Sequence, residues 1–81
     1  MQYKATIKIV TDQELEIGLG TYDIIYDAQR AATNAVAALS TDTISGRESL
    51  AFFNSVRKNG RGTLERTLDK GMCVATVQAI D

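Results

Sequence analysis

The sequence has 81 residues, of which 44% are hydrophobic, and its nine lysines and arginines face ten aspartates and glutamates for a net charge of −1. This length allows one small domain, and the apolar content is too high for a disordered chain. One cysteine excludes an internal disulfide, the lack of histidine removes the commonest general base and metal ligand, and no apolar run approaches the ~20 residues of a membrane-spanning helix. The N-terminus alternates with polar residues from the start, so we expect no secretory signal there.

Residues 2–10 alternate between apolar side chains at the odd positions and mostly polar ones at the even positions. A period of two with several β-branched residues predicts a half-buried β-strand. Polar residues 11–14 predict a hairpin turn, and residues 15–20 resume the alternation as a second strand. Gly18 and Gly20 weaken that strand and indicate a bulge or a close backbone approach.

Between residues 24 and 39 the apolar period changes to three and four residues, which predicts an amphipathic α-helix. Thr21 or Asp23 is expected to cap its N-terminus. Because most of its apolar stripe is alanine, this helix is expected to approach its neighbours closely. The stripe consists of Ile24, Ile25, Ala28, Ala31, Ala32, Ala35, Val36 and Leu39.

A second helix is predicted over residues 46–58. Ser45 followed by Glu48 matches a capping box, in which each side chain hydrogen-bonds to the backbone amide of the other residue. Gly60 is expected to end the helix, since glycine tolerates the left-handed conformation found there. The residues expected in the core are Leu50, Phe53 and Val56, with contributions from Ala51 and Phe52.

The last part of the chain predicts a second hairpin, with strands over residues 63–68 and 72–80. Gly71 is expected at a turn position that requires a positive φ. Neither face of the last strand is strongly polar, so we place this strand inside the sheet rather than at its edge.

The predicted element order is therefore ββααββ. It indicates a single compact α+β domain over residues 1–81, with a mainly antiparallel sheet of four strands and two consecutive helices packed on one face. An alternative omits the strand at 15–20 and leaves a sheet of three. Because so small a domain buries a limited core, association as a homodimer is a natural supplement.

Two features resemble sites for phosphate or metal but lack what such sites need. Gly18 and Gly20 precede a predicted helix, yet the third glycine of a dinucleotide-binding loop falls at Asp23. Three acidic residues also share one side of the first hairpin, where we expect a solvated rim rather than a divalent-cation site. They are Asp12, Glu14 and Glu16.

Cys73 lies in the middle of the last predicted strand. A reactive thiolate needs an electropositive, partly exposed setting or a histidine base, so we expect a small buried apolar side chain instead. A single unpaired thiol fits a reducing compartment, and the cytoplasm is the expected location.

The strongest functional lead is a basic segment over residues 57–66, which carries Arg57, Lys58, Arg61 and Arg66. Residues 1–44 hold three basic and six acidic side chains, whereas residues 45–81 hold six basic and four acidic. The charge is thus polarised, and the four cations are expected to share one end of the molecule. The competing interpretation is a solvated helix C-terminus, where positive charge suits the helix dipole.

These features predict a small non-catalytic binding module with no cofactor and no metal. We expect a regulatory or inhibitory accessory protein, of the kind that phages and mobile elements encode, which docks on a protein partner with an acidic surface. The alternative is a nucleic-acid-binding protein that uses the segment 57–66. Against it, the isoelectric point of about 5.3 indicates no broadly basic face.

Overall fold

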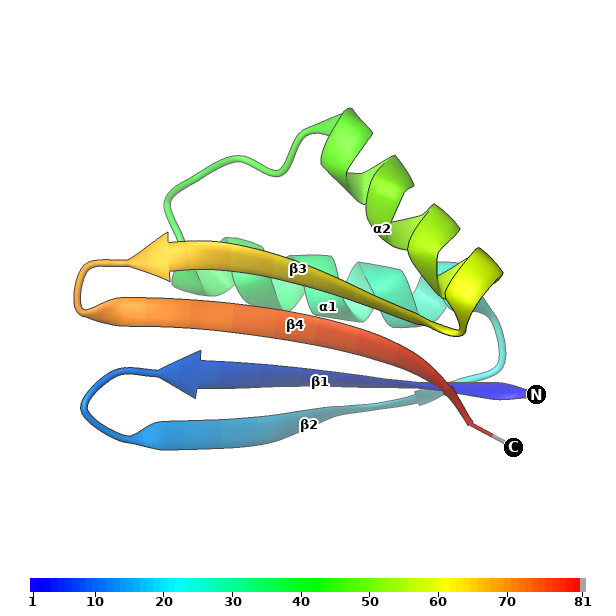
Figure 1. The fold of residues 1–81 in the computed structure, drawn as a ribbon, viewed down its shortest axis with the longest axis horizontal. Helices are drawn as coiled ribbons and strands as arrows, with labels where there is room; N and C mark the ends of the chain where they lie inside the picture. Colours follow the sequence, from blue (N-terminus) through cyan, green and yellow to red (C-terminus); the bar gives the residue numbers. More distant parts are fainter. Residues whose placement is uncertain (81) are drawn as a thin grey trace.

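The computed structural model describes residues 1–80 and shows an α+β fold with the predicted order ββααββ (Figure 1). Both hairpins and both consecutive helices form, so the predicted fold class is confirmed. The elements are β1 (Gln2–Val10), β2 (Glu14–Tyr22), α1 (Ile25–Leu39), α2 (Gly46–Asn59), β3 (Arg61–Leu68) and β4 (Gly71–Ile80).

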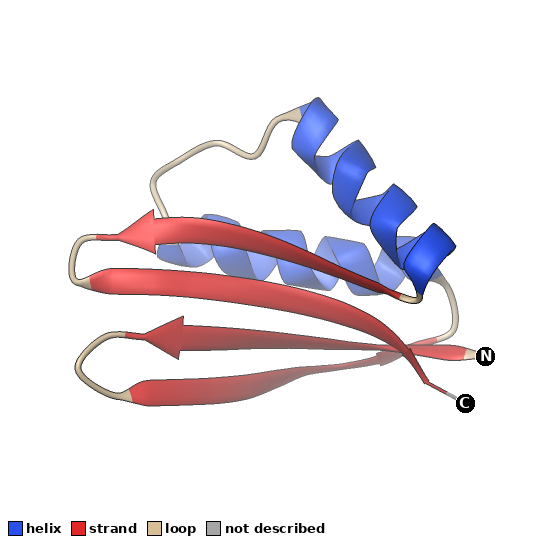
Figure 2. Cartoon of the chain, in the orientation of Figure 1, coloured by secondary structure: helices blue, strands red, loops and turns tan. Residues whose placement is uncertain are grey.

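All four strands join one antiparallel sheet in the order β2-β1-β4-β3, so the three-stranded alternative is wrong. The first and last strands of the chain pair at the centre of the sheet, which places β4 in the interior as predicted. Both helices cover the same face of the sheet (Figure 2). The opposite face is open and carries the side chains that alternate with the core residues, most of them polar, together with Val10, Met72 and Val74.

The core forms where α1 crosses the central strands. Ala28, Ala32 and Val36 are fully buried against a sheet layer that includes Ala5 and Ala75. Small side chains on both surfaces allow the helix to approach closely, as the alanine stripe predicted. Ile24 and Leu39 were expected in that stripe but lie at its two ends, and they remain 53% and 44% exposed.

Helix α2 begins and ends as predicted. The capping box between Ser45 and Glu48 is complete, and Gly60 adopts φ 77° in the left-handed region. The buried face of the helix consists of Phe52 and Val56, however, and Leu50 is 60% exposed. Two residues correspond to more than half a helical turn, so Leu50 and Phe52 cannot face the same side.

The expected cap of α1 is wrong. Ile24 occupies the N-cap position, and no side chain hydrogen-bonds to the first turn. Strand β2 extends to Tyr22, so Thr21 belongs to the sheet instead of the cap. Asp23, the other predicted cap, lies outside the strand directly before Ile24, and its side chain makes no cap hydrogen bond.

The role expected for Gly71 is also wrong, because its φ is not positive. A Cβ atom at this position would collide with the carbonyl oxygen of Val10 on the neighbouring strand. Glycine is therefore required here by a close backbone approach. The prediction for Gly18 and Gly20 is confirmed: the register shifts between Ala5 and Thr6, which pair with these two glycines, and Gly20 has φ 123°.

Candidate binding surface at the α2–β3 connection

Three of the four predicted binding residues lie at the connection between α2 and β3. Arg57 and Lys58 occupy the last turn of α2, and Arg61 is the first residue of β3. All three are exposed. We call Arg57, Lys58 and Arg61 the cationic end; in Figure 1 it lies at the same end of the molecule as the N-terminus.

The backbone that presents these side chains is held by three hydrogen bonds. The Gly60 amide donates to the Val56 carbonyl at 2.9 Å, which closes the helix, and the Ala79 amide donates to the Gly60 carbonyl at 2.7 Å. The Ser55 hydroxyl donates to the Arg61 carbonyl at 2.8 Å. The cations therefore project from a fixed turn rather than from a flexible loop.

Gly62 brings β3 against α2 directly behind Arg61. A Cβ atom here would lie 2.8 Å from side-chain atoms of both Phe52 and Val56. No larger residue fits without a shift of the helix or the strand. The sequence shows this glycine only as part of a loop-like run, so its packing role could not be predicted.

The charges of the cationic end are not neutralised within the described structure. The ion pairs found among residues 1–80 join Lys8 to Glu14 and Arg66 to Glu48. The guanidinium of Arg57 makes one long hydrogen bond, 3.5 Å, to the Asn54 side chain. These cations are thus available to an external anionic group.

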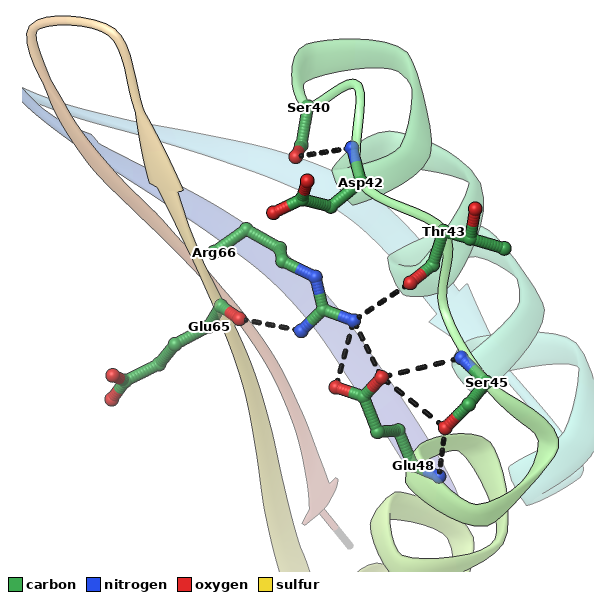
Figure 3. Close-up of polar contacts among 7 residues, drawn as sticks. All are labelled: Ser40, Asp42, Thr43, Ser45, Glu48, Glu65 and Arg66. Carbon is green, nitrogen blue, oxygen red and sulfur yellow. Dashed lines mark hydrogen bonds and ion pairs between the residues drawn. The ribbon is translucent and has the colours of Figure 1, made fainter.

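Arg66 lies elsewhere and has a different environment. It is five residues further along β3, and its side chain is only 12% exposed (Figure 3). Its guanidinium lies 2.7 Å from both carboxylate oxygens of Glu48 and donates to the carbonyls of Thr43 and Glu65 at 3.2 and 2.8 Å. The structure therefore does not bring Arg66 to the end that holds the other three cations.

Glu48 links this arginine to the start of α2. Its carboxylate accepts hydrogen bonds from the backbone amide and the hydroxyl of Ser45, both at 3.2 Å. The hydrogen bond from the Ser45 amide, followed by that from Arg66, holds the pKa of Glu48 below its usual value. One carboxylate thus caps α2 and links the helix to β3 through Arg66. The role of Arg66 is therefore structural.

Cys73 is fully buried between the helices and the sheet, as predicted. Burial raises the pKa of its thiol, because the thiolate would lose its hydration. The side chain therefore acts as a small apolar core residue.

The open face of the sheet carries a trough that was not predicted from the sequence. Its volume is about 400 Å³, and it lies beside the cationic end because Arg61 belongs to both. The alternation of polar residues in the first strand was the available signal. Its lining residues are Thr6, Lys8, Glu16, Arg61, Val74, Thr76 and Gln78.

The carboxylates of the first hairpin are exposed, and Glu14 forms an ion pair with Lys8. Within residues 1–80 no three side chains of the metal-binding types come together as a potential ion site. Of the two described helices, neither is long and apolar enough to cross a membrane. Comparison of the chain with protein-family models, curated proteins and solved structures gave no match.

Proposed function

We propose that this protein is a non-catalytic binding module that docks through the cationic end on an acidic surface of a protein partner. Its biological role would be that of a regulatory or inhibitory accessory protein of the phage or mobile-element type, acting in the cytoplasm. The observation that carries the proposal is the set of three adjacent exposed cations, none of which has a carboxylate partner among the described residues.

The contrast with Arg66 supports this proposal. Arg66 forms an ion pair with Glu48 and hydrogen bonds with two backbone carbonyls, and these interactions stabilise the fold. Within residues 1–80, Arg57, Lys58 and Arg61 make no comparable interaction, although the turn that presents them is fixed by hydrogen bonds. A preorganised cation loses little conformational freedom in the backbone when it meets an anion, which favours binding.

The test uses charge reversal at the cationic end with a matched control. One variant carries Arg57→Glu, Lys58→Glu and Arg61→Glu. The control reverses three exposed cations elsewhere, which gives both variants the same net charge. These control positions are Arg30, Arg47 and Lys70.

The partner is captured on the immobilised parent protein from a nuclease-treated lysate of the native source, and then purified and titrated by calorimetry. We expect the first variant to bind at least tenfold more weakly, about 1.4 kcal/mol, and the control to bind within about threefold of the parent. Added salt should weaken the parent in the same direction. Equal binding by both variants would overturn the proposal, and loss of capture after nuclease treatment would favour the nucleic-acid alternative.

A further inference from the structure

The open face of the sheet is arranged in rows that run across the strands. Residues paired between neighbouring strands face the same side, so the register defines these rows. We name the first the cationic row (Thr21, Lys4, Gln78 and Arg61) and the second the threonine row (Gly18, Thr6, Thr76 and Thr63). Then follow the acidic row (Glu16, Lys8, Val74 and Glu65) and a last row of Glu14, Val10, Met72 and Thr67.

Charge is divided between these rows. The cationic and threonine rows together carry two cations, one amide and several hydroxyls, and they contain no carboxylate. The acidic side chains of the face lie in the two rows further from the cationic end. The half of the open face next to Arg61 therefore offers hydrogen-bond donors and positive charge to an anionic group.

Shape follows from side-chain length. Thr6 and Thr76 of the threonine row are short side chains that line the trough, with Gln78 and Arg61 on one side and Lys8 and Glu16 on the other. Lys4 and Arg61 are two strand spacings apart, about 10 Å, with Gln78 between them. Their long side chains can therefore reach one segment that lies along the row.

We propose that the trough binds an extended acidic segment of the protein partner. Arg61 and Gln78, which line the trough, and Lys4, which lies beside it in the cationic row, hold its carboxylates. The hydroxyls of Thr6 and Thr76 meet its backbone, and Glu16 on the opposite side of the trough keeps the carboxylates toward Arg61. This proposal rests on the proposed function, and it adds the open face of the sheet to a surface otherwise limited to the α2–β3 connection.

Two observations favour a peptide over other anions. The trough is an open concavity on a sheet face and not an enclosed pocket, which suits a segment of chain more than a small molecule. None of the four rows contains an aromatic side chain on which a base could stack. Stacking is a main source of affinity for single-stranded nucleic acid, so an acidic peptide is the better match.

The experiment compares two glutamate substitutions on the same strand and the same face. Thr63→Glu adds a carboxylate to the threonine row beside Arg61, whereas Thr67→Glu adds one four residues away in the last row. Both threonines are exposed on the edge strand β3. The two variants therefore have the same charge and a comparable effect on the fold, which thermal unfolding verifies.

The probe is a short polyglutamate peptide, with polyglutamine and oligothymidylate of the same length as controls. Amide chemical shifts of the labelled protein are followed during each titration. We expect polyglutamate to shift Thr6, Thr76, Gln78 and Arg61, and Thr63→Glu to weaken its binding at least fivefold while Thr67→Glu changes it less than twofold. Polyglutamine should produce no comparable shifts.

The outcomes separate this proposal from the previous one. Chemical shifts confined to Arg57 and Lys58, together with equal polyglutamate affinities of Thr63→Glu and Thr67→Glu, would overturn binding in the trough. Docking at the α2–β3 connection would remain possible. Shifts in the trough with no effect of Arg57→Glu and Lys58→Glu would support the trough and contradict the proposed function. Stronger and more extensive shifts with oligothymidylate would overturn the acidic peptide as ligand.

Discussion

The two arginines of β3 differ in almost every physical respect. Arg61 begins the strand, is exposed and has no carboxylate partner among the described residues, whereas Arg66 is 12% exposed and engages Glu48 through both carboxylate oxygens. In the sequence they are equivalent members of one basic segment. The difference arises from Glu48, 18 residues away, and shows that an arginine's role depends on what the fold places around it.

The largest effect is expected from the packing behind Arg61. Gly62→Ala inserts a methyl group 2.8 Å from side-chain atoms of Phe52 and Val56, so α2 and β3 must move apart. We expect a loss of roughly 1–3 kcal/mol in the free energy of unfolding. Urea denaturation measures this loss, with Gly18→Ala as the control: a Cβ there meets no atom within 4 Å, and its effect should stay within about 0.5 kcal/mol.

The next effect tests the comparison itself. Arg66→Met keeps most of the side-chain volume but removes the hydrogen bonds that the guanidinium donates to the backbone carbonyls of Thr43 and Glu65. We therefore expect a loss of about 1–2 kcal/mol in unfolding free energy. Arg61→Met should change it by less than about 0.5 kcal/mol, as an exposed substitution does. Equal losses of unfolding free energy in the two variants would contradict the assignment of a structural role to Arg66 and a binding role to Arg61.

A smaller effect concerns pH. The folded-state pKa of Glu48 is lowered, so the stability that this carboxylate contributes is present above its unfolded-state pKa and is lost as the pH falls through the folded-state value. The unfolding free energy of the parent should therefore decline below about pH 5. Glu48→Gln should show a shallower decline across the same range in urea titrations at each pH. Parallel curves would show that Glu48 is not a source of the acid sensitivity.

The sequence predicted the fold where local signals and tertiary structure agree. The alternation in the strands, the alanine stripe and the capping box at Ser45 each require a few neighbouring residues. All were confirmed except the two ends of the stripe, where Ile24 and Leu39 are exposed. The expected cap of α1 and the expected φ of Gly71 were wrong, and strand pairing explains why for Thr21, which belongs to β2, and for Gly71. Whether Val10 approaches Gly71 depends on pairing between distant strands, which no local pattern contains.

The candidate site divides in the same way. Arg57, Lys58 and Arg61 are close in sequence and remain close in the structure, so the basic segment identified them. The position of Arg66 depends on Glu48, and the trough depends on the register of all four strands, neither of which could be derived. Spacing along the chain predicts which charges are neighbours, but it does not predict which of them are neutralised.

The smallest effect is expected where binding is proposed. Replacement of both Arg57 and Lys58 by glutamine removes two exposed cations from the last turn of α2. Among the described residues they interact with the helix dipole, and Arg57 also with Asn54. Such interactions contribute a few tenths of a kcal/mol each, so the thermal midpoint should fall by no more than about 3 °C. The same variant should bind the acidic partner several-fold more weakly in calorimetry. A large fall in the midpoint with unchanged binding would assign both cations to the fold, as for Arg66, and remove the distinction on which the proposed docking surface depends.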